Sequence, residues 1–217
     1  MNFKAVLFDL DGTLLNTIED LADSTNAALS RFGYPTHNLE SYRYFIGSGV
    51  RNLIKKALPE KLQSNNNIIE QCLEEMRKQY SVRWADKTRP YDGIPELLNT
   101  LAQMGIKMCI LSNKPDDFTQ IIAAKLLSPW KFEEVWGERR GVPIKPDPTS
   151  AMKIAQLMGL HANDCIYLGD SGTDMQTGNA AGMYPVGAAW GFRTATELEE
   201  AGAKMIIYHP SELLKLF

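Results

Sequence analysis

An apolar run near the N-terminus that ends in two aspartates constrains the fold of this chain most. Residues 3–8 read as a buried strand, and Asp9, Asp11 and Gly12 follow directly. Side chains at positions i and i+2 of an extended chain point to the same side, so we expect both carboxylates to face one way. Gly12 permits a sharp turn after them. A surface turn with two solvated acids is the alternative, but buried parallel strands carry functional groups at their carboxyl ends.

Beyond residue 94, strand-like runs alternate with helical patterns, which is typical of a parallel sheet with crossover helices. The pattern predicts strands at residues 107–111, 165–168 and 183–187, with weaker ones at 134–136 and 204–207. It predicts helices at residues 95–104, 116–127, 149–158 and 173–181. The predicted fold class is α/β, a Rossmann-like doubly wound parallel sheet.

The interval between the first strand and residue 107 is far longer than the dozen residues that a crossover needs. Its apolar residues recur three and four apart, first at residues 21–32 and again at 68–80, as in amphipathic helices. The sequence therefore predicts an all-helical cap domain at residues 17–88, inserted into a core domain of residues 1–16 and 89–217. Residues 14–17 and 86–93 would be its hinges, and the cap would act as a lid.

Composition excludes several classes of protein. The chain has 217 residues, 44% of them hydrophobic, and a formal net charge of -3, so it offers no basic field for nucleic acid. No apolar stretch approaches a membrane span, and Asp9 interrupts the N-terminal run too early for a signal peptide. We expect a cytoplasmic protein with no membrane partner. The three cysteines, Cys72, Cys109 and Cys165, are expected to be core residues without a disulfide or metal role.

Polar residues also follow the other predicted strands. Ser112 and Asn113 end one strand just before a helix, where they would either cap that helix or help to bind phosphate. Asp170 and Asp174 follow another strand, as helix-terminal acids or as part of a site. Lys145 supplies a cation in a segment that prolines hold extended. Each has a structural explanation alone, but together they predict one polar site at the carboxyl edge of the sheet.

These four elements, taken in order, resemble the haloacid dehalogenase superfamily of phosphohydrolases. The elements are Asp9-x-Asp11-Gly12-Thr13, Ser112-Asn113, Lys145-Pro146 and Gly169-Asp170-x-x-x-Asp174. Essentially the whole chain is covered, including a helical cap after the first strand. Within the superfamily, Ser112-Asn113-Lys114-Pro115, Lys145-Pro146-Asp147-Pro148 and Gly47-Ser48-Gly49 resemble the phosphoglycolate phosphatase-like branch.

The resemblance implies a role for each of these residues. Asp9 would attack phosphorus and form an aspartyl-phosphate, and Asp11 would carry the proton to the leaving oxygen. Clustered carboxylates need a cation, and an all-oxygen set suits Mg²⁺, which Asp9, Asp170 and the Asp11 backbone carbonyl would ligate. Asp174 would orient a metal-bound water or Lys145. The residues expected to hold the phosphoryl group or the rest of the substrate are Lys145, Ser112, Asn113, the amide of Gly12, and Arg51.

Several alternatives remain at this point. Arg51 or Arg43 of the cap would meet a substrate carboxylate, or both are solvated helix charges. Asp11 favours phosphate over halide chemistry, since dehalogenases of this fold lack that acid, and it speaks against a phosphonate-cleaving role for Lys55 or Lys56. A β-phosphoglucomutase-like isomerase, a pyrophosphatase, an aspartyl-phosphate receiver and a catalytically silent binding module are the other candidates. The expected partner is a small phosphorylated metabolite, and the expected assembly is a monomer or homodimer.

Overall fold

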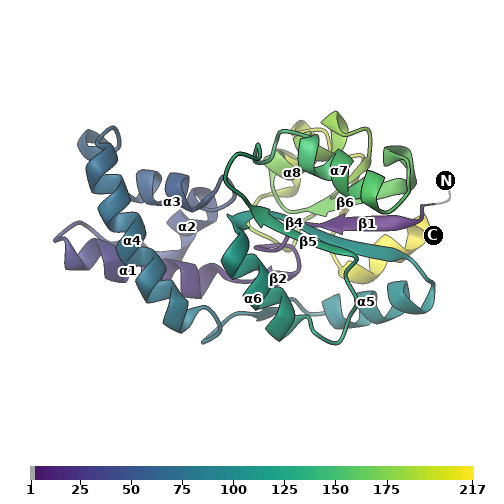
Figure 1. Ribbon diagram of the computed structural model, residues 1–217, viewed down its shortest axis with the longest axis horizontal. Helices are drawn as coiled ribbons and strands as arrows, with labels where there is room; N and C mark the ends of the chain where they lie inside the picture. The colour runs from purple at the N-terminus through teal and green to yellow at the C-terminus, as the bar shows by residue number, and fades with distance from the viewer. Residues whose placement is uncertain (1–2) are drawn as a thin grey trace.

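A six-stranded parallel sheet forms the centre of the protein in the computed structural model, which describes residues 3–217 (Figure 1). The strand order is β5-β4-β1-β6-β7-β8. The strands are β1 (Ala5–Phe8), β4 (Lys107–Pro115), β5 (Glu134–Glu138), β6 (Cys165–Gly169), β7 (Tyr184–Ala188) and β8 (Met205–Ile207). The predicted α/β fold class is confirmed. Among the strands, only β4 departs clearly from its predicted bounds: it continues past Leu111 through the polar residues to Pro115.

Helices cover both faces of the sheet. In Figure 1, α5 (Ile94–Gln103) and α6 (Asp116–Leu126) lie below it, and α7 (Thr149–Leu157) and α8 (Gly172–Ala180) lie above it. All four begin and end within one or two residues of their predicted bounds. The remaining elements of this part are α9 (Ala195–Glu200) and the short 3₁₀ helices Ala162–Asp164 and Pro210–Leu216.

Strand β1 explains why the sheet needs helices on both faces. All four of its residues are fully buried. Ala5 and Leu7 belong to the hydrophobic cluster beside α7, whereas Val6 and Phe8 belong to the larger cluster beneath the sheet. This alternation is what a strand buried on both sides requires. The predicted core positions of the cysteines are confirmed, since all three are buried.

Four helices make up most of the inserted segment, at the left of Figure 1. They are α1 (Ile18–Arg31), α2 (Leu39–Phe45), α3 (Val50–Ala57) and α4 (Asn66–Arg83), with a 3₁₀ turn at Glu60–Leu62. The sequence pattern indicated α1 and α4, which contact each other along their lengths. It did not separate α2 from α3, because helices of seven and eight residues contain too few turns to show a period.

The two segments that join the cap to the core pair with each other. β2 (Leu15–Asn16) and β3 (Arg89–Pro90) form a short antiparallel ribbon. Asp20 of α1 strengthens the return segment by accepting hydrogen bonds from the backbone amide and hydroxyl of Thr88, at 2.8 and 2.7 Å. The inserted helices therefore leave and rejoin the core at one point.

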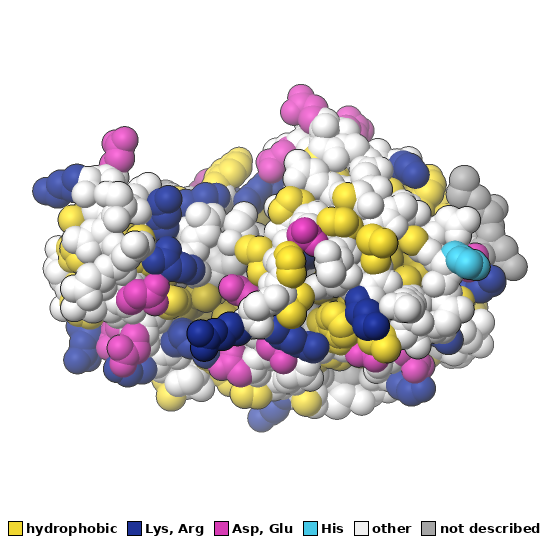
Figure 2. All heavy atoms as spheres, turned by 45° about the horizontal axis from the view of Figure 1, so that its top comes forward, with side chains coloured by type: hydrophobic (Ala, Val, Ile, Leu, Met, Phe, Trp, Pro, Cys, Tyr) yellow, Lys and Arg dark blue, Asp and Glu magenta, His cyan; other side chains and the backbone are white. Residues whose placement is uncertain are grey.

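The surface carries both signs of charge. On the face in Figure 2, acidic and basic side chains are interspersed over the helical end and the sheet-containing end. Of the helices in residues 3–217, none combines the length and the apolar character that crossing a membrane would take.

Candidate active site

The carboxyl ends of three adjacent strands bring the predicted residues together. β1 pairs with β4 on one side and β6 on the other, so that Phe8 lies opposite Ile110 and Leu168. Asp9 directly follows Phe8, and Ser112 and Asp170 come two residues after Ile110 and Leu168; all three polar residues are buried. The sheet therefore builds the predicted polar site from segments that are far apart in the chain.

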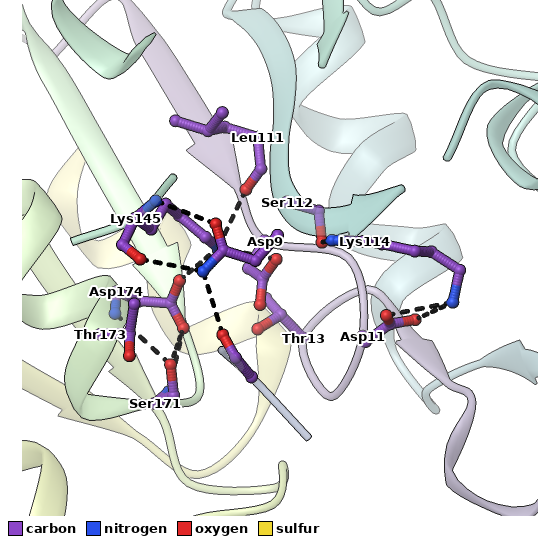
Figure 3. A network of polar contacts seen from close by, with 12 residues as sticks. Asp9, Asp11, Thr13, Leu111, Ser112, Lys114, Lys145, Ser171, Thr173 and Asp174 are labelled. Carbon is purple, nitrogen blue, oxygen red and sulfur yellow. Dashed lines mark hydrogen bonds and ion pairs between the residues drawn. The ribbon is translucent and has the colours of Figure 1, made fainter. Parts of the chain in front are cut away.

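Lys145 is at the centre of this site (Figure 3). Its Nζ lies 2.9 Å from Asp9 Oδ1 and 2.7 Å from Asp174 Oδ1, and it donates to the Leu111 carbonyl at 3.1 Å. The Lys145 side chain is only 2% exposed. Burial alone lowers the pKa of Lys145, but the carboxylates of Asp174 and Asp9 outweigh it and raise the pKa well above its usual value. Lys145 is therefore a permanent cation shared by two aspartates.

Three buried carboxylates surround a position that suits a metal ion. Asp9, Asp170 and Asp174 each offer an oxygen, and these atoms lie within 4.8 Å of one another. Burial raises the pKa of Asp9 to about 6, with Lys145 opposing the shift. Burial, then the charges of Asp174 and Asp9, raise the pKa of Asp170 well above its usual range. One lysine does not balance three carboxylates in so buried a place, so the donor set fits a hard divalent cation such as Mg²⁺.

The oxygens of Asp170 and Asp174 are held by nearby donors. Asp170 accepts from the Thr13 hydroxyl at 3.2 Å and from the Phe192 amide at 2.7 Å. Asp174 accepts from both the amide and the hydroxyl of Ser171, which caps helix α8. The expected role of Asp174 as a helix-terminal acid is thus correct, and its other oxygen is the one that binds Lys145. Asp174 is therefore both a helix-terminal acid and part of the site.

Asp11 departs from the expectation that it faces the same way as Asp9. Its carboxylate accepts from Lys114 Nζ at 3.0 and 3.1 Å, away from Lys145, as Figure 3 shows. β1 ends at Phe8, so the alternation of a strand does not extend to Asp11, and the chain has already turned. Both carboxylates nevertheless line one cleft. The two aspartates therefore have different cations as partners.

Gly12 makes the sharp turn that the sequence predicts. Its amide donates to the Leu15 carbonyl at 2.9 Å, and binding of substrate by this N–H remains a prediction. A Cβ at Gly12 would collide with the Asp170 carboxylate, and one at Gly191 would collide with Asp170 and the Gly12 carbonyl. The positive φ of Gly12, 88°, also favours glycine. Trp190 packs here, and its indole donates to the Thr13 carbonyl at 3.0 Å.

Ser112 and Asn113 do not cap helix α6. Strand β4 continues to Pro115, and Pro115, two residues after Asn113 and three after Ser112, is the N-cap of the helix that begins at Asp116. Asn113 instead connects three segments: it donates to the carbonyl oxygens of Gly47 and Lys145 and accepts from the Lys145 amide. It therefore positions Lys145 and ties it to the cap. Ser112 is buried and lines the cleft.

The cleft lies between the strand ends and the cap. Asp9, Asp11, Ser112, Asn113 and Lys114 form its polar side. The other lining residues come mainly from the cap and are mostly apolar: Leu21, Ile46, Gly47, Gly49, Val50, Leu53, Met76, Tyr80, Pro115 and Phe118.

The two candidate arginines of the cap, Arg51 and Arg43, are engaged elsewhere. Arg51 does not line the cleft, and its guanidinium contacts Glu70 at 3.0 Å and Asn66 at 2.9 Å. Arg43 donates to the Gly191 carbonyl at 3.2 Å. The structure thus brings together every predicted site residue except Arg51, whose role in substrate binding remains a prediction.

Sequence reasoning missed two residues of the cleft, Lys114 and Tyr80. The motif Ser112-Asn113-Lys114-Pro115 contains Lys114 but does not by itself assign it a role, although Lys114 lies two residues after Ser112 in the same strand. The period of two places both side chains on one side, and this signal was available. Tyr80 comes from α4 in the cap, and its ring lies 4.6 Å from Lys114 Nζ. Only the folded arrangement of cap and core brings it here.

Comparison with known proteins agrees with the fold. Residues 6–188 match the family described as haloacid dehalogenase-like hydrolase. A phosphoglycolate phosphatase of Pseudomonas savastanoi pv. phaseolicola is 31% identical over 207 residues, covering 94% of this chain and 76% of the relative. Another, from Mannheimia succiniciproducens, is 30% identical over 99% of this chain and 98% of its own.

Solved structures show the same fold. A predicted phosphoglycolate phosphatase from Haemophilus somnus superposes with a TM-score of 0.90 at 25% identity, covering 100% of this chain and 98% of that one. With its family match spanning most of the sequence, the chain belongs to the haloacid dehalogenase-like hydrolases. Within that family it is a phosphatase, and the resemblance drawn from the sequence motifs is confirmed.

Proposed function

We propose that the chain is a Mg²⁺-dependent phosphomonoesterase that acts on a small organic phosphate, phosphoglycolate or a similar compound, through an aspartyl-phosphate. The observation that carries the proposal is the position of Asp9. Its carboxylate lines the cleft, is only 8% exposed, and is paired with the buried cation of Lys145. A carboxylate held in this way is a nucleophile ready for in-line attack on a phosphoryl group bound above it.

The neighbouring residues stabilise the phosphoryl group and transfer protons. Lys145 offsets the charge of Asp9 and of the phosphoryl oxygens, and Asp174 and Asn113 hold it in place. Ser112 donates to the phosphoryl group. Asp11, which lines the same cleft, transfers a proton to the leaving oxygen and then removes one from the hydrolytic water.

Asp9 and Asp170, with the backbone carbonyl of Asp11, would hold Mg²⁺, which neutralises charge on the phosphate oxygens. The chemistry of the donors supports this assignment, because the three clustered carboxylates have a single lysine among them. The predicted cytoplasmic location and the predicted domain boundaries, with a cap at residues 17–88, remain parts of this proposal.

The test is release of inorganic phosphate from phosphoglycolate. We expect activity that a chelator abolishes and that added Mg²⁺ restores. Acid-quenched protein should show a mass increase of one phosphoryl group in the wild type and none in Asp9→Asn. Asp86→Asn, which changes an exposed carboxylate of the linker, is the matched control and should behave like the wild type. Hydrolysis without a phosphorylated protein in any quench would rule out the covalent route.

A further inference from the structure

The wall of the cleft contains very little positive charge. Its cap side is formed mostly by apolar side chains from α1, α3 and α4. Among the residues of the described chain that line the cleft, Lys114 is the one with a positive charge. A negatively charged leaving group that enters this cleft therefore has a single side chain to pair with.

Lys114 is placed beside the residue that handles the leaving oxygen. Its Nζ lies 3.0 Å from Asp11 Oδ1 and 3.1 Å from Oδ2, and the side chain is 3% exposed. An ammonium group has three donors, and Asp11 does not need all of them. The apolar surroundings strengthen any further pairing, because the local dielectric is low.

Tyr80 supplies an unused polar atom at the same place. The side chain is 1% exposed, and its hydroxyl has no hydrogen-bond partner among the residues that the structure describes. The ring lies against Lys114 Nζ, at 4.6 Å from the centroid, and lines the cleft. Buried hydroxyls normally have partners, so this oxygen is explained if a ligand supplies the missing one.

We infer that Lys114 Nζ and Tyr80 Oη together bind the carboxylate of a short phosphorylated 2-hydroxy acid, and so determine which phosphate ester is accepted. The inference rests on the proposed phosphatase function. In such an ester the carboxylate carbon is two bonds from the bridging oxygen. If Asp11 protonates that oxygen, the carboxylate must lie within reach of whatever lies against Asp11, which is Lys114. Selectivity for the acid then comes from the core strand β4 and helix α4, with no contribution from Arg51.

The first test compares two substrates that differ only in the carboxylate, phosphoglycolate and 2-hydroxyethyl phosphate. In Lys114→Met we expect kcat/KM for phosphoglycolate to fall about 10- to 100-fold, the size of one lost charge-assisted pair. For 2-hydroxyethyl phosphate kcat/KM should also fall, because Asp11 loses its cation in either case, but by at least about 10-fold less than for phosphoglycolate. Lys55→Met, an exposed cap lysine, is the matched control and should alter neither. Equal losses on both substrates would mean that Lys114 acts only through Asp11, which overturns the inference.

Tyr80→Phe keeps the test decisive if Lys114→Met folds poorly. It removes one oxygen that has no partner in the described chain, so the fold should tolerate it. We expect kcat/KM for phosphoglycolate to fall about 3- to 10-fold, as for one neutral hydrogen bond, with 2-hydroxyethyl phosphate unaffected. Unchanged selectivity in this variant contradicts the role of the hydroxyl.

Binding separates this inference from the proposed reaction. In the Asp9→Asn background, calorimetry with Mg²⁺ present should show phosphoglycolate binding more tightly than 2-hydroxyethyl phosphate, and Lys114→Met should remove the difference. Equal affinities, or no binding of either compound, overturn the inference. If the wild type released no phosphate but still preferred the acid in binding, the proposed function would fail and the carboxylate site would stand.

Discussion

The floor and the roof of the cleft are built in opposite ways. The floor, at the ends of β1, β4 and β6, is a network of buried charges in which Lys145 contacts both Asp9 and Asp174. The roof, made by the cap, is largely apolar, and Asn113 of the floor donates to one of its backbone carbonyls, that of Gly47. A charge network allows little change without loss of function, whereas an apolar wall can be resized. The reaction chemistry therefore belongs to the floor, and we assign selectivity to the place where Lys114 of the floor meets Tyr80 of the roof.

Asp9→Asn should produce the largest effect, because it removes the nucleophile. We expect kcat to fall by at least about 10³-fold, the scale of losing a nucleophile in other hydrolases. The unfolding temperature should hold or rise, since one of three clustered carboxylates is neutralised. Phosphate release and thermal unfolding measure the two effects. Residual activity near the wild-type level would place the chemistry somewhere other than the floor.

We expect the second-largest effect from Lys145→Met, which should lower both activity and stability. Two buried carboxylates lose their cation, and breaking such a pair costs about 3–5 kcal/mol in unfolding free energy. Urea unfolding measures the loss, and phosphate release should fall in parallel. The exposed Lys125→Met is the control. A variant that keeps its stability would show that the network is not what holds the floor together.

Gly191→Ala should have an intermediate effect, because the added methyl group would collide with Asp170 and with the carbonyl of Gly12. We expect roughly a 10²-fold loss of kcat, in line with the cost of a displacement of about 1 Å at a reacting centre. Gly105→Ala, far from the site and with a positive φ of 71°, should lose stability but keep kcat. Similar kcat losses in both variants would point to general unfolding.

Arg51→Ala should have the smallest effect, because its partners are Glu70 and Asn66 on the surface of the cap. We expect KM for phosphoglycolate to change less than about 2-fold and stability by less than about 1 kcal/mol, as for exposed ion pairs. Steady-state kinetics decide the matter. A large rise in KM would show that this part of the roof reorganises around the substrate and that Arg51 binds it after all.

The elements whose bounds the sequence predicts well are those whose pattern reflects burial. Long periodic segments such as α4 and buried runs such as β6 were predicted, because their patterns arise from burial on a known face. The short helices α2 and α3 were not distinguished. In the site, the positions of Asp9 and Asp170 directly after β1 and β6 were predictable from a rule about parallel sheets. The partner of Asp11 was not, because the chain has turned after β1 and periodicity no longer applies.

The sequence by itself determined the order of strands and helices, the insertion of a helical segment, and the need for cations beside clustered aspartates. These follow from periodicity, spacing and charge, which are properties of the chain alone. The tertiary structure decided which cation each aspartate meets, Lys145 for Asp9 and Lys114 for Asp11, and it brought Tyr80 of the cap against Lys114. Such pairings depend on how elements distant in sequence pack together, and no local pattern encodes them.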